Sequence, residues 1–163
     1  MALPILASVM KLARAAAAKI TTRAAGRFNR PSVKMLKEDM QRLGEEIAEE
    51  FKDTVIENIE TNRYGYELKQ STIDRKGSAI PLVDSHKLVD SIYRDGTTVS
   101  VEDTPRDDSP LSNLELAMVH EYGTKDKGIP ARPVWRQTFK DFEETARGRI
   151  SSFLDEPKFK QRS

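Results

Sequence analysis

Apolar residues between positions 31 and 60 recur at steps of three or four, which places them on one face of a helix. A glutamate-rich polar face lies opposite this stripe, and Pro31-Ser32 is typical of a helix start. The pattern predicts a long amphipathic helix, in which Gly44 is either a weak spot or a place of close approach. The stripe consists of Val33, Leu36, Met40, Leu43, Ile47, Phe51, Val55 and Ile59.

A second long helix is predicted near the C-terminus. Pro133 can open it, because proline lacks only an N–H that the first helical turn does not use. Pro157 is expected to end it. Its apolar stripe consists of Trp135, Phe139, Phe142, Ala146, Ile150, Phe153 and Leu154.

Shorter elements are expected between these helices. The stretch DSHKLVDSIY at 84–93 predicts a short helix, with Asp84 or Ser85 as N-cap, or a run straight into a strand. Asp95-Gly96 between residues of strand type indicates a β-hairpin, in which Val99 and Val101 alternate with Ser100.

Residues 111–122 have two possible periodicities. A helix would place Leu111, Leu114, Met118 and Tyr122 on one face and end at Gly123, whereas a strand would align Leu114, Leu116 and Met118. We favour the helix. Together the elements predict an α+β fold, with two long amphipathic helices and shorter helices packed on a small, mainly antiparallel β-sheet with long loops.

The polar stretch at 61–85 is longer than most connections in a compact domain. We expect its 62–82 part to form a hairpin that projects toward a partner, or to become ordered only on assembly. The residues expected at an interface are Arg63, Tyr64, Tyr66 and Lys69.

Charge divides the chain into segments although the net charge is only +1. Residues 1–30 contain no acid and form a basic, Ala-rich arm, whereas Ser32–Thr61 holds nine acids against four bases. We expect a single α+β domain over 31–157 and a basic tail over 158–163. The arm is interpreted as a helix or a mobile segment, and a removable targeting segment is a less favoured alternative. Its bases are Lys11, Arg14, Lys19, Arg23, Arg27 and Arg30.

Sequence motifs do not favour an enzyme, a cofactor site or a metal site. The chain has no cysteine, and His120-Glu121 lacks the second histidine of a zinc-protease helix, because Thr124 stands at that position. A metal nuclease that uses Asp53, Glu67 and Lys69 is a weak alternative. We therefore expect no catalytic residues, no cofactor and no bound metal.

The stretch EYGTKDKGIPARPVWRQTF at 121–139 joins two predicted helices. We expect Gly123 to cap the first helix and Trp135 to anchor the second in the core. Glu121 and Arg132 are suited to a charge-assisted hydrogen bond across the connection, and Lys125, Asp126 and Lys127 at its tip are expected to touch a neighbouring subunit.

Two segments resemble the neck or tail-completion proteins of tailed bacteriophages, the virion-morphogenesis and minor-tail class. PLVDSHKLVDSI at 81–92 is similar to that family's PL-x-D-[ST]-G-x-L-x-x-S-[IL] pattern, with His86 in place of the glycine. The segment 118–139 is similar to its E-[FY]-G-T … [MI]-P-A-R-P-[FW]-[LIW]-R pattern. The residues that carry the second likeness are Glu121, Gly123, Thr124, Pro130, Arg132, Pro133 and Trp135.

The resemblance implies a structural virion protein, one subunit of a head–tail connector ring that lines the DNA passage. It implies a homo-oligomer of six or twelve copies, found in the virion at the head–tail junction and in the host cytoplasm during assembly, with no membrane partner. Its neighbours would be portal, adaptor or stopper proteins on the head side and tail terminator, tube or sheath proteins on the tail side. Packaged double-stranded DNA is a further possible partner of the arm, and the alternative function is a small DNA-binding module that uses this arm.

Overall fold

The computed structural model describes residues 30–77, 79–82, 86–107 and 109–155. The elements are α2 (Arg30–Glu60), α3 (Gln70–Lys76), α4 (Lys87–Asp90), β1 (Ile92–Asp95), β2 (Thr98–Val101), α5 (Asn113–Tyr122) and α6 (Val134–Leu154). The predicted α+β class is confirmed, with two long helices and a two-stranded antiparallel sheet. Apart from Arg30, the first residue of α2, the arm bases lie outside the described residues, as does the tail at 158–163.

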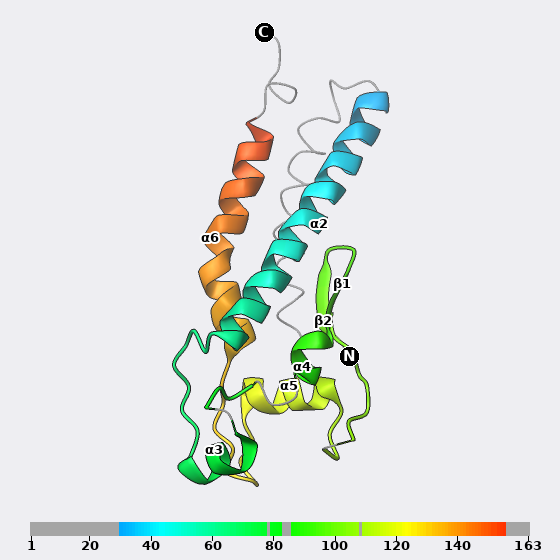
Figure 1. Cartoon of the computed structure of the whole chain (residues 1–163). Helices are drawn as coiled ribbons and strands as arrows, with labels where there is room; N and C mark the ends of the chain where they lie inside the picture. The colour runs from blue at the N-terminus through cyan, green and yellow to red at the C-terminus, as the bar shows by residue number, and fades with distance from the viewer. Residues whose placement is uncertain (1–29, 78, 83–85, 108, 156–163) are drawn as a thin grey trace.

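The α2 and α6 helices pack along each other and form the spine of the molecule (Figure 1). Their stripes meet through aromatic rings, because Phe51 of α2 lies edge-on to Phe139 and 5.5 Å from Phe142, measured between ring centroids. On the outer side of this seam, Arg149 of α6 donates to Glu46 and to Glu50 of α2, at 2.9 and 2.7 Å. Apolar burial therefore holds the two helices together, and the ion pairs mark their register.

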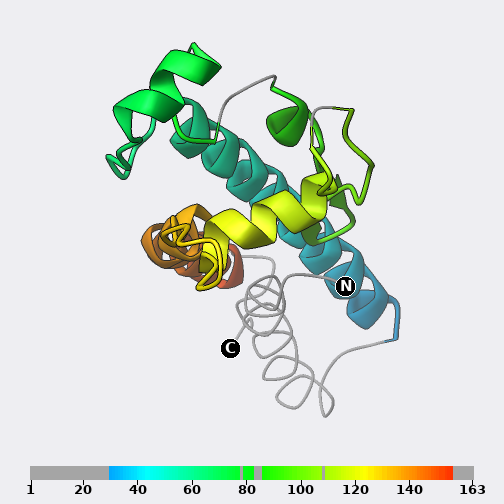
Figure 2. The ribbon, with the colours of Figure 1, turned by 90° about the horizontal axis from the view of Figure 1, so that it is seen from below.

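The middle of the chain lies across one end of this spine. Seen from below, α6 is viewed nearly end-on and α5 crosses in front of α2 (Figure 2). The short helix α4 leads into β1, and its Leu88 and Val89 are buried in the same core as Val99 and Val101 of the hairpin. Both readings of residues 84–93 are thus correct in part, since a short helix runs almost directly into a strand.

Two details of this region differ from expectation. Asp95 pairs with Thr98, so the hairpin turn consists of Gly96 and Thr97, one residue later than predicted, with Gly96 at φ +56°. The N-cap of α4 is His86, which adopts a left-handed backbone at φ 56°, while Asp84 and Ser85 lie outside the described residues. In both places a positive φ fixes the turn, and only the first is occupied by glycine.

The predicted hairpin at 62–82 is wrong for the described part of that stretch. A turn at 61–64 ends α2, an extended segment follows, and residues 70–76 form α3. Asn62 adopts φ 47° and accepts from the backbone N–H of Tyr66, while its own amide donates to the Tyr66 carbonyl. This exchange closes the turn locally, so the segment needs no strand partner.

The face assigned to α5 is also partly wrong. Leu114 is buried as expected, but Met118 and Tyr122 are 40% and 45% exposed. The buried face includes Asn113, Ala117 and Glu121 instead. Ser112 starts the helix in a capping box with Glu115, which fixes its rotation relative to the core.

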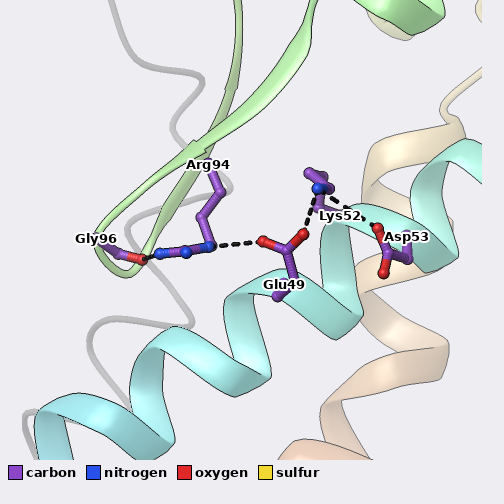
Figure 3. Close-up of polar contacts among 5 residues, drawn as sticks. All are labelled: Glu49, Lys52, Asp53, Arg94 and Gly96. Carbon is purple, nitrogen blue, oxygen red and sulfur yellow. Dashed lines mark hydrogen bonds and ion pairs between the residues drawn. The ribbon is translucent and has the colours of Figure 1, made fainter.

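The hairpin is fastened to α2 by a small charged cluster (Figure 3). Arg94 donates to Glu49 at 2.7 Å and to the carbonyl of Gly96, and Lys52 donates to the same glutamate. These two cations hold the pKa of the Glu49 carboxyl below its usual range, with the hydrogen bond from Lys52 as the largest cause. Just beyond the cluster, Gly44 of α2 faces the hairpin tip, so the close approach considered from sequence is confirmed.

We predict that the pKa of Glu49, measured by carboxyl NMR titration, rises in Arg94→Gln. The lowered pKa means that the folded state favours the ionised carboxylate, so its contribution to stability is present above pH ~4.5 and is lost as the pH falls through the folded-state pKa. The Arg147→Gln variant is the control, because Arg147 pairs with Glu143 on α6. An unchanged Glu49 pKa in Arg94→Gln would show that this contact does not form in solution.

We also predict opposite responses to alanine at two helical glycines. Gly148→Ala on α6 should raise the free energy of unfolding by about 1 kcal/mol, because its Cβ would meet nothing within 4 Å. Gly44→Ala should raise the free energy of unfolding by less than Gly148→Ala does, or lower it, because its Cβ would lie 2.9 Å from Thr97 Cγ2. Chemical denaturation measures both variants.

The Thr97→Ser background isolates the cause, since it removes that methyl group and keeps the hydroxyl. In this background Gly44→Ala should approach the gain of Gly148→Ala. Equal gains for the two alanines with Thr97 in place would contradict the close packing of the hairpin on α2.

Candidate interaction surface

The connection between α5 and α6 is organised by Glu121, whose side chain is 0% exposed. Its carboxylate accepts from the backbone N–H groups of Trp135 and Arg136, each at 3.1 Å, and from Nε of Arg136 at 2.8 Å. The first backbone N–H groups of a helix have no partner within the helix, and Pro133 supplies no side-chain cap to α6. Glu121 therefore caps α6 from the preceding helix, with its charge at the positive end of the α6 dipole.

Arg136 completes this joint from the other side. Its guanidinium also donates to the backbone carbonyl of Glu121 at 2.8 Å, so one side chain satisfies both a carboxylate and an acceptor at the end of α5. The same guanidinium lies 5.1 Å from the centre of the Tyr122 ring, in a cation–π arrangement. The end of α5 and the start of α6 are thus joined by the Glu121–Arg136 ion pair and by the hydrogen bonds that these two residues make to the backbone.

The expected pairing of Glu121 with Arg132 is wrong. The Arg132 guanidinium donates to the Glu67 carbonyl at 3.4 Å, and its backbone N–H donates to the carbonyl of His120. Arg132 precedes the first turn of α6, whereas Arg136 lies within it and meets the buried carboxylate. The sequence has no Ser, Thr, Asp or Asn N-cap before Val134. This absence could have predicted that a residue from another element caps the start of α6.

Gly123 ends α5 as expected, and the surrounding backbone leaves no room for a side chain at this position. It has φ +70°, and a Cβ there would lie 2.6 Å from the Ile129 carbonyl and 2.8 Å from the Ala131 nitrogen. Thr124 and Ile129 then exchange two backbone hydrogen bonds, at 2.9 and 3.1 Å. They close a turn whose tip, Lys125 to Gly128, is fully on the surface.

The other residues of the connection between α5 and α6 differ in their burial. Trp135 is buried, as predicted for an anchor, and Thr138 one turn later is completely buried. Pro130 lies exposed in the extended lead-in to α6, and Pro133 occupies the N-cap rather than the first turn. Lys125, Asp126 and Lys127 are exposed as expected, and their contact with a neighbouring subunit stays a prediction.

The Tyr64 and Tyr66 rings lie against α6, and their expected contact with a partner stays a prediction. The Tyr64 hydroxyl lies 3.1 Å from Asp141 Oδ2 and 3.2 Å from Thr138, and the Tyr66 hydroxyl donates to Gln137 at 2.7 Å. Burial against α6 raises the pKa of both phenols. The two rings, 6.2 Å apart, fix the 61–69 segment to α6, while Arg63 and Lys69 remain exposed.

The described residues contain no group of three or more His, Asp or Glu side chains placed to hold a metal ion. Asp53 pairs with Lys52 on α2, and Glu67 and Lys69 lie in the extended segment that precedes α3. No described helix combines the length and the apolar character that a membrane crossing requires. A small cavity of about 10 Å³, close to the minimum for one water molecule, lies beside His120, Glu121 and Trp135.

No protein-family model matches the chain, and neither curated proteins nor solved structures provide a significant match.

We predict that Glu121→Gln lowers the free energy of unfolding by about 3 kcal/mol, because an amide cannot accept from all the donors that meet the carboxylate. Arg136→Gln should cost less, about 2 kcal/mol, since the Arg136 side chain is 47% exposed and both backbone N–H bonds to Glu121 remain. Urea denaturation of the single variants gives these values.

A double-mutant cycle identifies the partner of Glu121. The coupling between Glu121→Gln and Arg136→Gln should exceed about 1 kcal/mol, whereas the matched cycle with Arg132→Gln should give a coupling near zero. The reverse order of the two couplings would show that Arg132 is the partner in solution.

Proposed function

We propose that this chain is a structural subunit of a bacteriophage head–tail connector, a neck or tail-completion ring that joins the DNA-filled head to the tail. The proposal rests on the two-part resemblance at 81–92 and 118–139. The observation that carries it is that separated residues of the second pattern contact one another: its glutamate, Glu121, is bound by its final arginine, Arg136. A contact between two positions of the pattern gives a structural reason for their fixed spacing along the sequence.

The fold also explains why the two patterns have glycine at the positions of Gly123 and His86. Gly123 occupies a place where a side chain would clash with backbone, which accounts for a glycine in the pattern. His86 stands where the first pattern has glycine, and its backbone φ of 56° is the conformation that glycine favours. One departure remains, since Val134 takes the place of the pattern's aromatic residue and is buried in the core.

The charged and apolar groups on the described surface also support a binding role. Its charged residues form short ion-pair clusters between α2, α6 and the hairpin, and its exposed features include two large apolar side chains of α5 and a charged turn. Proteins that act by assembling need such surfaces on a rigid scaffold. The connector subunit is the function that unites this surface with the sequence patterns.

We predict that the purified protein forms closed rings, seen by negative-stain electron microscopy and by sedimentation analysis. A phage that lacks the protein should accumulate filled heads detached from tails, and adding the purified protein should join them. A protein that stays monomeric at all concentrations and does not join heads to tails would overturn the proposal. Binding to DNA without ring formation would favour the small DNA-binding module instead.

A further inference from the structure

The outer face of α5 exposes two large apolar side chains, Met118 and Tyr122. They lie one helical turn apart on the same side of α5, so they form one patch rather than scattered exposures. The helix buries the adjacent side, where Asn113, Ala117 and Glu121 lie, and also Leu114, one turn before Met118. The exposure therefore follows from a fixed rotation of α5, which its capping box sets at the N-terminus and Glu121 sets at the C-terminus.

Positive charge adjoins this apolar patch. Arg136 covers one side of the Tyr122 ring and remains about half exposed, while its charge is paired with the buried Glu121. The turn that follows α5 presents Lys125 and Lys127 with Asp126 between them, and Glu115 is exposed on α5 three residues before Met118. Among the described residues, the two lysines are thus the unpaired cations of this region. In Figure 1 the connection between α5 and α6 lies at the lower end of the molecule, below the ends of both long helices. We call the set Met118, Tyr122, Lys125, Lys127 and Arg136 the α5–tip surface. The two lysines of this surface suit an acidic partner.

The same chain exposes an acidic surface on the last turns of α2. Asp53, Glu57 and Glu60 are all exposed and follow one another at steps of four and three, on the side of α2 opposite its buried stripe. We call these three residues the acidic crest. A shallow hollow lined by Glu57, Asn58, Thr61 and Arg63 lies beside it and offers room for a side chain.

The acids that flank the crest are neutralised within the fold, whereas most of the crest is not. Arg149 pairs with Glu46 and Glu50, and Lys52 and Arg94 pair with Glu49. Among the described residues, Asp53 has only the 3.5 Å contact with Lys52, and no ion pair involves Glu57 or Glu60. The crest therefore keeps a negative charge that an external cationic surface can match.

The position of the crest works against the stability of α2. The C-terminal end of a helix carries a partial negative charge, so Glu57 and Glu60 lie at the unfavourable end, and the last turn of α2 contains no basic residue. Binding of a cationic surface would remove this repulsion.

We propose that the α5–tip surface of one subunit binds the acidic crest of the next subunit, head to tail, in the ring. This inference rests on the proposed function and names the contact that would build the ring. The two surfaces lie on different elements, so the contact is heterologous and repeats around a closed ring when the rotation is correct. A second copy is the occupant we favour, because the chain itself carries exposed acids that match the lysines of the α5–tip surface.

Charge reversal on each side tests the contact. The tip variant Lys125→Glu/Lys127→Glu and the crest variant Glu57→Lys/Glu60→Lys should each require at least about tenfold higher concentration to form rings. An equimolar mixture of the two variants should assemble again, because each reversed tip then meets a reversed crest. Mass photometry and negative-stain microscopy measure the rings, and the mixed rings should contain the two variants in equal numbers.

Two controls separate the contact from unfolding and from general charge effects. Lys140→Glu reverses an exposed lysine of α6 outside both surfaces and should leave assembly unchanged. The crest variant should melt at a higher temperature than the unaltered protein, because lysine suits the end of α2, while its assembly is lost. A crest variant that loses assembly only because it melts at a lower temperature would contradict the inference.

The outcomes distinguish the inference from the function on which it rests. If the unaltered protein forms no rings, the proposed function and the inference both fail. If it forms rings that both reversals leave intact, or that the mixture does not restore, the inference alone fails. Rings that persist in the tip variant while a salt-sensitive gel shift with double-stranded DNA disappears would assign the tip to nucleic acid and overturn the inference.

Discussion

The removal of one carboxylate from water sets the geometry of the whole molecule. Glu121 has no exposed surface, and such a charge is tolerated only where donors replace the water it loses. Two backbone N–H groups of α6 and the guanidinium of Arg136 do so. These donors exist in the right place only when α6 has started at Val134 and α5 has ended at Tyr122. The two helix ends therefore specify each other, and neither can shift by a residue without stranding a charge.

This joint controls how the rest of the core assembles. The α6 helix leaves the joint with Trp135 and Thr138 already buried, and its next turns meet Phe51 of α2 through Phe139 and Phe142. The tyrosines of the 61–69 segment reach Gln137 and Asp141 on the same turns. A rotation of α6 at its start would move all these contacts together. The aromatic packing stabilises the fold, whereas the buried charge selects one arrangement of it.

Periodicity could predict the elements that bury a continuous stripe, and it did so for α2 and α6, because each long stripe has only one face that can enter a core. It failed where a partner is chosen by three-dimensional placement. Arg132 and Arg136 are both close to Glu121 in sequence, and only the start of α6 decides between them. Tyr64 and Tyr66 lie in a polar stretch, so nothing local showed that α6 would offer acceptors for their hydroxyl groups.

The α5 helix shows the same limit more sharply. Its apolar residues could be placed on one face by spacing, yet the fold buries Glu121 and leaves Met118 and Tyr122 outside. Burial of a charged residue in preference to two large apolar ones is unfavourable unless the charge caps another helix. The capping requirement of α6 therefore determines the exposed surface of α5. The patterns identified Glu121 but not Arg136 as a member of this joint, and the exposure of Met118 and Tyr122 is a consequence of the joint that the two residues form.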